Sequence, residues 1–111
     1  MVTIICTQQK EANVLPIVWD EKKNQVNIKK HGISFQEASL VFDDPHLMEF
    51  YDEKHSTASE DRYIVFGMIQ ENIVVYAVYT ERKDQIRLIM ARKAQPQEEA
   101  LYDKHLKETF G

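Results

Sequence analysis

Three apolar segments in the second half of this 111-residue chain limit its fold more than any other feature. They read RYIVFGMI, IVVYAVYT and IRLIMARKA, and they are joined by the short polar connectors QEN and ERKDQ. Connectors of this length and polarity are typical of β-hairpins, which join antiparallel strands. An earlier segment, HLMEFYD, is a further strand candidate ahead of a polar loop. The sequence therefore predicts an antiparallel β-meander in the middle of the protein.

Two short helices are predicted before the meander. Asp20 is placed to cap the start of the segment EKKNQVNIKKH, and Gly32 is placed to close it. Ser34 and Glu37 have capping-box spacing ahead of a second helix, which Pro45 ends. A third helix is expected over the segment QPQEEALYDKHLKETF, which opens with a proline and two glutamates. The fold class expected is α+β, with two N-terminal helices, an antiparallel sheet and a C-terminal helix.

The chain has the length of one domain and not of two. Residues 1–13 have no regular apolar pattern and are expected to form a loosely attached extension to a domain over residues 14–111. The segment VLPIVW predicts a short strand, and Pro16 favours a place at the edge of the sheet. No apolar run reaches the length of a helical membrane span, and no basic leader precedes the first apolar patch. Since Cys6 is the only cysteine, no disulfide within the chain is possible and the cytoplasm is the expected compartment.

The net charge is −4, from 18 acidic and 14 basic side chains, which is not typical of a general nucleic-acid coat. The charges are unevenly placed, however. Residues 43–61 are strongly acidic, whereas the segment KKNQVNIKKH is basic without an acid. A basic site on an acidic molecule is therefore allowed, although a solvated helix face or helix capping explains the same basic run.

The segment QIRLIMARKA carries three cations along one of the most apolar stretches of the chain. Strand alternation predicts that Arg92 shares a face with residues 86, 88 and 90, beneath the helices. It predicts that Arg87 and Lys93 lie on the opposite face, which would be exposed to solvent or to a ligand. The structural alternative is that these cations pair with carboxylates at the ends of the strand.

The segments VWDEKKNQVNIKKHGISFQEASLVFDDP, EDRYIVFG, YTERKDQIRLIMARKA and LYDKHL resemble the BrnT toxins of bacterial type II toxin–antitoxin systems. The resemblance covers roughly residues 17–106 in the same order along the chain, and the combination of KHGISF, VFDDP, YTER and ARKA is quite specific. Residues 1–13 lie outside the family pattern. Met90 departs from it, because a small serine is usual in the family at this position.

The resemblance implies a compact RelE-like domain and a metal-independent ribonuclease that arrests growth. It also implies a BrnA-like ribbon-helix-helix antitoxin that neutralises the toxin in a hetero-oligomer, with DNA contacted only indirectly through the antitoxin. Cleavage of RNA without a metal requires a base for the 2′-hydroxyl, a stabiliser for the anionic phosphorane and an acid for the leaving 5′-oxygen. Arginine suits the second task because its planar, charged fork grips phosphate at two points.

The predicted catalytic residues are therefore Arg82, Arg87 and Arg92 for charge stabilisation, with Glu60 and His31 for proton transfer. The predicted RNA-binding residues are Lys30, Arg62, Lys93 and Tyr102. Each has a structural alternative. An arginine can serve an ion pair, His31 can cap a helix, Glu60 can be a solvated loop carboxylate, and Tyr102 belongs to an apolar helix stripe that favours core packing.

No metal site and no cofactor are expected. The four histidines show no metal-ligand spacing, the two aspartates before Pro45 are usual at a helix end, and a glycine-rich phosphate loop is missing. The competing functional interpretation is a binding module without catalytic activity, or a degenerate toxin whose remaining role is repression together with its antitoxin.

Overall fold

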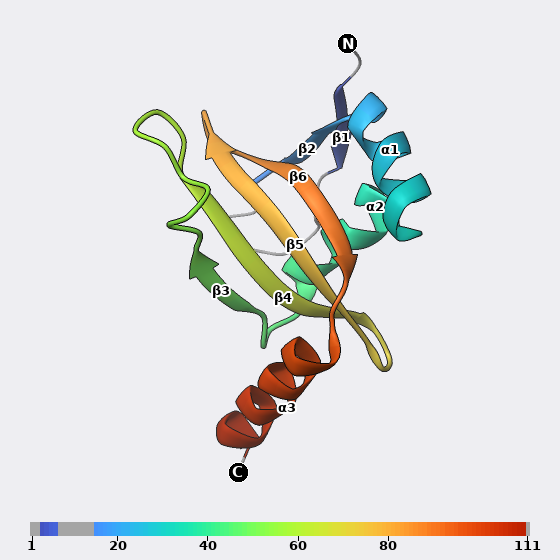
Figure 1. Cartoon of the computed structure of the whole chain (residues 1–111), viewed down its shortest axis with the longest axis vertical. Coiled ribbons are helices and arrows are strands. Elements are labelled where there is room, and N and C mark those ends of the chain that lie inside the picture. Colours follow the sequence, from blue (N-terminus) through green and yellow to red (C-terminus); the bar gives the residue numbers. More distant parts are fainter. Residues whose placement is uncertain (1–2, 7–14, 111) are drawn as a thin grey trace.

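A computed structural model describes residues 3–6 and 15–110 of the chain (Figure 1). In these residues six strands form one mixed sheet, in the order β1-β2-β6-β5-β4-β3. The strands are β1 (Thr3–Cys6), β2 (Ile17–Asp20), β3 (Met48–Tyr51), β4 (Arg62–Gln70), β5 (Ile73–Arg82) and β6 (Gln85–Lys93). The helices are α1 (Glu21–His31), α2 (Phe35–Ala38), the 3-10 helix η1 (Ser39–Asp43) and α3 (Pro96–Phe110). The predicted α+β class and the antiparallel meander of β3 to β6 are confirmed.

The predicted helix caps are present. The Asp20 carboxylate accepts a hydrogen bond from the Lys22 amide at 2.9 Å, and Gly32 closes α1 with a φ of 72°. Ser34 and Glu37 form the reciprocal capping box. The second helix changes after four residues into η1, so that the predicted helix is a short α-helical turn followed by 3-10 geometry.

The predicted edge position of the VLPIVW strand is wrong. Strand β2 lies between β1 and β6, antiparallel to the first and parallel to the second, and all four of its residues are buried. Pro16 does not interrupt the pairing because it precedes the strand, where its carbonyl accepts a hydrogen bond from the Ile86 amide at 2.9 Å. A proline just ahead of a strand loses no ladder hydrogen bond.

Residues 3–6 form the strand β1, which the sequence analysis did not predict. The backbone of this strand pairs with β2 along four residue pairs, from Thr3 opposite Asp20 to Cys6 opposite Ile17. Residues 7–13 lie outside the described residues. The division of the chain into an extension and a domain at residue 13 therefore stays a prediction.

The two faces of the sheet are covered differently. The helices α1, α2 and η1 pack on one face, and buried core side chains fill the space between them and the sheet, among them Trp19, Phe35, Val41 and Leu88. On the other face the described residues cover only one end, with α3, whose Tyr102 packs with Phe66 of β4. In Figure 1, α3 lies at the lower end of the sheet, while α1 and α2 lie to the upper right. The remainder of this second face is here called the open face.

A β-bulge in β6 overturns the predicted alternation of the cations. Met90 pairs with Val78 but Leu88 pairs with Tyr79, so that Ile89 is an extra residue in the strand. Beyond the bulge every side chain changes face. Arg92 consequently pairs with Tyr76 and lies on the open face. The prediction that it shares the covered face with Leu88 is wrong.

The bulge also changes the face on which Lys93 lies. The lysine pairs with Val75 and is therefore on the helix side of the sheet, not on the open face as predicted. The lysine remains exposed there because it is the last residue of the strand. Arg87 precedes the bulge and pairs with Thr80, so it keeps its predicted place on the open face. Arg87 and Arg92, which simple alternation assigns to opposite faces, therefore share one face.

Candidate active site

A hollow of about 150 Å³ lies on the open face where the turn after β3 meets the start of β4, the middle of β5 and the bulge of β6. Its floor is apolar and its rim is polar. It is lined by Asp52, His55, Arg62, Tyr76, Val78, Ile89 and Met90. We refer to it as the central hollow.

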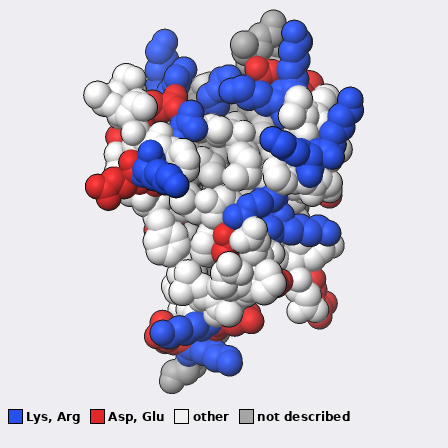
Figure 2. Space-filling model, viewed as in Figure 1, with Lys and Arg blue, Asp and Glu red and all other residues white. Residues whose placement is uncertain are grey.

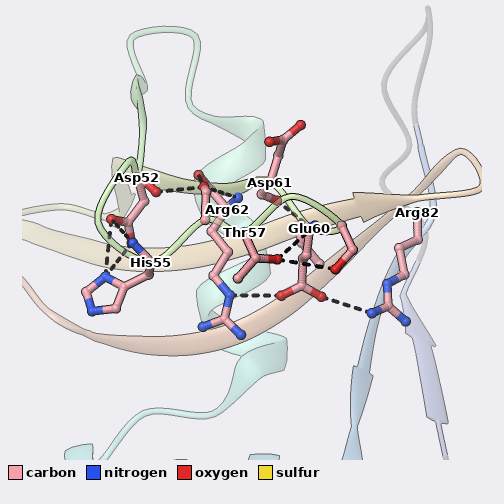
Figure 3. A network of polar contacts seen from close by, with 10 residues as sticks. Asp52, His55, Thr57, Glu60, Asp61, Arg62 and Arg82 are labelled. Carbon is pink, nitrogen blue, oxygen red and sulfur yellow. Dashed lines mark hydrogen bonds and ion pairs between the residues drawn. The ribbon is translucent and has the colours of Figure 1, made fainter.

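Glu60 joins two arginines at the edge of this hollow (Figure 3). One carboxylate oxygen accepts from Nε of Arg62 and the other from Nη2 of Arg82, each at 2.9 Å. The hydrogen bond from Arg62 has the largest effect on the pKa of Glu60 and that from Arg82 the next largest, and both hold this pKa below its ordinary value. A carboxylate that is occupied in this way is a weak proton acceptor, so its geometry does not support the predicted role of Glu60 as the base. Its position instead serves to orient Arg62.

His55 and Asp52 form a second polar pair in the central hollow (Figure 3). Nδ1 of His55 lies 2.9 Å and 3.2 Å from the two carboxylate oxygens of Asp52. Asp52 is 7% exposed, whereas the His55 side chain is 60% exposed. Neither residue is among the predicted site residues. The available signal was an aspartate followed by a histidine three residues later, directly after a strand, and many solvated loops share that signal.

Arg92 is held on the open face by Glu98 and Tyr76. Its guanidinium makes a bidentate ion pair with Glu98 of α3, at 2.7 Å and 2.8 Å, and lies 3.9 Å from the centre of the Tyr76 ring. The hydrogen bonds with Glu98 raise the pKa of Arg92, and those with Arg92 lower the pKa of Glu98. Arg92 therefore connects α3 to the sheet and adds positive charge beside the hydroxyl-bearing ring of Tyr76.

Arg87 differs from the other three arginines of the candidate site. Arg62, Arg82 and Arg92 each have a carboxylate partner. For Arg87, in contrast, the described part of the chain provides no ion pair or side-chain hydrogen bond. It is half-buried on β6 next to β2. All its N–H groups are thus available to an anion that approaches from the open face.

Lys30 and His31 are separated from the central hollow by the bulge of β6. They line a hollow of about 290 Å³ between α1 and β6, together with Lys22, Lys23, Val26, Asn27, Ile89 and Met90. We refer to it as the lysine hollow. Because Ile89 and Met90 also line the central hollow, the bulge is a shared wall between the two. Figure 2 shows that Lys and Arg side chains surround an uncharged centre in the upper two thirds of this view.

The remaining predicted residues lie away from the central hollow. Tyr102 is 1% exposed and its hydroxyl donates a hydrogen bond to Asp44, so it is a core residue beneath α3. Burial and this hydrogen bond both raise the pKa of the tyrosine. Lys93 is on the helix side of the sheet, as described above. The buried position of Tyr102 does not favour its predicted contact with RNA.

Among the described residues, no three acidic, histidine or cysteine side chains lie close enough together to hold a metal ion. Within the same residues, none of the helices has the length and apolar character needed to cross a membrane.

With helices on one face of a mixed sheet and arginines on the other, the chain has the architecture of a small α+β domain with a surface suited to an anionic ligand. The family model described as "Ribonuclease toxin, BrnT, of type II toxin-antitoxin system" matches residues 19–98, and the chain belongs to this family. Among solved structures, the fold is similar to the crystal structure of the Brucella abortus ribonuclease toxin, BrnT, with a TM-score of 0.54 and 25% sequence identity. The match covers 69% of this chain and 92% of that one. A comparison with curated proteins gave no match.

Proposed function

We propose that this toxin cleaves single-stranded RNA on the open face, without a metal ion, by attack of a 2′-hydroxyl on the adjacent phosphate. The observation that carries the proposal is the bulge of β6, since it places Arg87 and Arg92 on the same face as Arg62. Three permanently charged groups on one face favour the dianionic phosphorane of such a reaction over the singly charged substrate.

The arginines have different roles in this proposal. Arg87 binds the scissile phosphate directly because its donors are not engaged by a carboxylate. Arg62 contributes its terminal nitrogens while Glu60 fixes its Nε, and Arg82 holds Glu60 in turn. Arg92 raises the local potential from its position over Tyr76. Pre-oriented donors of this kind lose little energy to reorganisation as charge develops in the transition state.

The lysine hollow extends the proposed binding surface away from the scissile phosphate. Lys22, Lys23 and Lys30 supply charge for a neighbouring phosphate, and Val26, which is 59% exposed, supplies an apolar surface for a base. His31 lies in the same hollow, so we propose that it binds RNA and does not transfer a proton. Binding to unpaired RNA usually combines such charge with surfaces on which bases stack.

We further propose that the domain, over residues 14–111, is RelE-like, acts in the cytoplasm, arrests growth and is neutralised by a BrnA-like ribbon-helix-helix antitoxin. Contact with DNA then occurs only through that antitoxin, in a hetero-oligomer. Membership of a type II toxin–antitoxin family supports an antitoxin partner and an RNA substrate. An antitoxin that covers the cations of the open face would block the substrate, and its association rate would fall as salt is added.

The test is cleavage of a synthetic RNA oligonucleotide by the purified chain in the presence of EDTA. We expect cleavage that leaves a 2′,3′-cyclic phosphate and a 5′-hydroxyl. An oligonucleotide with a single 2′-deoxy nucleotide at the cleaved position should be resistant at that position. Cleavage that requires a divalent cation, or that proceeds at the deoxy position, would contradict the proposed chemistry. An inactive chain that still binds its antitoxin would favour the degenerate toxin.

A further inference from the structure

The surroundings of the two residues predicted to transfer protons do not favour that role. Glu60 is engaged by two arginines, and His31 lies in the lysine hollow beyond the bulge. Cleavage by a 2′-hydroxyl nevertheless needs a group that accepts its proton, and imidazole is the side chain whose charge changes in the neutral pH range. The central hollow contains one histidine, His55.

His55 has the geometry of a histidine oriented by a carboxylate. The Asp52 carboxylate can only accept hydrogen bonds, so Nδ1 of His55 carries the proton that lies between them. The neutral ring then presents a lone pair at Nε2. Within the described residues Nε2 has no hydrogen-bond partner, and the exposed ring lets a substrate reach it.

Asp52 is itself fixed by the backbone around it. Its amide donates to the carbonyl of Arg62 at 2.8 Å, and its carbonyl accepts from the amide of Ser56 at 3.0 Å. The Ser56 hydroxyl accepts from the Arg62 amide at 2.9 Å, which closes the turn on the first residue of β4. The turn that carries His55 is therefore anchored to the backbone of Arg62, whose side chain is a candidate phosphate-binding group.

We infer that His55 is the general base of RNA cleavage in the central hollow and that Asp52 is its positioning residue. This inference rests on the proposed function. Nε2 of His55 takes the proton from the 2′-hydroxyl as the 2′-oxygen bonds to phosphorus. The bond from phosphorus to the 5′-oxygen breaks, and the 5′-oxygen takes a proton from solvent water. Asp52 stabilises the imidazolium that results.

The groups that face His55 are consistent with this role. Arg62 of β4 and Tyr76 of β5 line the same hollow, and the β6 wall contributes Ile89 and Met90. A phosphate drawn to Arg62 therefore lies in the hollow that His55 also lines. Met90 carries no hydroxyl, so the proton acceptor proposed here does not depend on one at this position of the wall.

A purely structural role is the competing explanation, because the Asp52 carboxylate also lies 3.3 Å from the His55 amide and so caps the turn. The experiment must separate the two. It compares His55→Ala and His55→Gln with the matched control His105→Ala, which removes a histidine from α3. Each variant is tested for thermal unfolding, for RNA cleavage across the neutral pH range, and for cleavage after addition of imidazole.

We expect both His55 variants to be folded and to cleave RNA about 10²-fold or more slowly than the parent. The acid limb of the pH–rate profile should be lost with them, and free imidazole should restore part of the activity of His55→Ala. Asp52→Asn should show a smaller loss that imidazole does not restore. His105→Ala should behave as the parent.

Two results would overturn the inference while the proposed function stands. One is a His55→Gln protein that cleaves RNA at the parental rate. The other is a His55→Ala protein that is slow, keeps the parental pH profile and does not respond to imidazole, since this would indicate a structural role. If the parent chain itself leaves RNA intact, the proposed function fails and the inference fails with it.

Discussion

The side chain of Asn27 takes the place of a missing strand beside Ala91. Its amide group donates to the Ala91 carbonyl at 2.8 Å and accepts from the Ala91 amide at 3.2 Å. It also donates to the carbonyl of Ile33 at 2.9 Å. Strand β2 pairs with β6 only next to Ile86 and Arg87, so the β6 backbone beyond the bulge lacks a strand partner on that side. Asn27 thus secures α1 to the bulged strand at the wall of both hollows.

The first prediction is that Asn27→Ala destabilises the protein by about 2–4 kcal/mol. The substitution leaves three buried backbone groups without their partner, and each such group costs about 1–3 kcal/mol unless water reaches it. Urea unfolding measures the free energy. The control is Gln25→Ala on the same helix, whose exposed side chain bonds only to Glu21 and should contribute no more than about 0.5 kcal/mol. Equal effects of the two substitutions would show that Asn27 does not secure the helix.

The second prediction concerns the pH dependence of stability. The ion pair with Arg92 lowers the pKa of Glu98 below its ordinary value of 4.5. A carboxylate with a depressed folded-state pKa stabilises the protein above its unfolded-state pKa, and this contribution is lost as the pH falls through the folded-state value. Glu98→Gln should therefore lower the free energy of unfolding by about 1–3 kcal/mol at neutral pH, and by progressively less below about pH 4.

The matched control for this pair is Glu99→Gln, because the neighbouring glutamate of α3 is exposed. Its effect should be small at every pH. A difference between Glu98→Gln and the parent that stays constant from neutral to acid pH would show that the charge of Glu98 contributes nothing to stability. The destabilisation would then come from packing alone.

Local signals in the sequence predicted the elements well. The caps at Asp20, Gly32 and Ser34 depend on residues within a few positions of each other, and all three are present. The hairpin between β5 and β6 has positive φ at Lys83 and Asp84, as a tight two-residue connection requires. Such features depend on short-range sterics and hydrogen bonding, which a sequence pattern records directly.

The candidate site was predicted less well because it depends on contacts between distant segments. Next to the bulge at Ile89, the Ala91 backbone bonds to Asn27, which is 64 residues away in the sequence, and no local sequence pattern predicts this contact. One extra residue reverses every face assignment beyond it, which is why Arg92 was placed wrongly. The ion pair of Glu60 with Arg82 likewise joins the loop before β4 to the last residue of β5, and the two residues are 22 positions apart in the sequence.

The third prediction tests residues 1–13, which the family pattern does not include. Deletion of these residues should leave RNA cleavage unchanged, because the described residues that line the central hollow all lie between positions 52 and 90. It should lower the melting temperature by less than about 5 °C, which corresponds to roughly 1 kcal/mol in a domain of this size. The hydrogen bonds of β1 to β2 are at an edge where water can replace them. A larger fall would show that β1 is an integral part of the sheet.

The last prediction separates the two cations of β6 that the bulge brings onto one face. Arg87→Ala should reduce RNA cleavage by about 10²-fold or more, as the loss of a pre-oriented electrostatic group does. Its stability should change by no more than about 0.5 kcal/mol, because Arg87 has no carboxylate partner in the described part of the chain. Arg92→Ala should lose activity and also about 1–3 kcal/mol of stability, since it leaves the 15% exposed Glu98 carboxylate unpaired. Lys107→Ala at the end of α3 removes a cation elsewhere and serves as the control for net charge. An Arg87→Ala protein that is folded and as active as the parent would exclude this strand from catalysis, and its cations would then be structural.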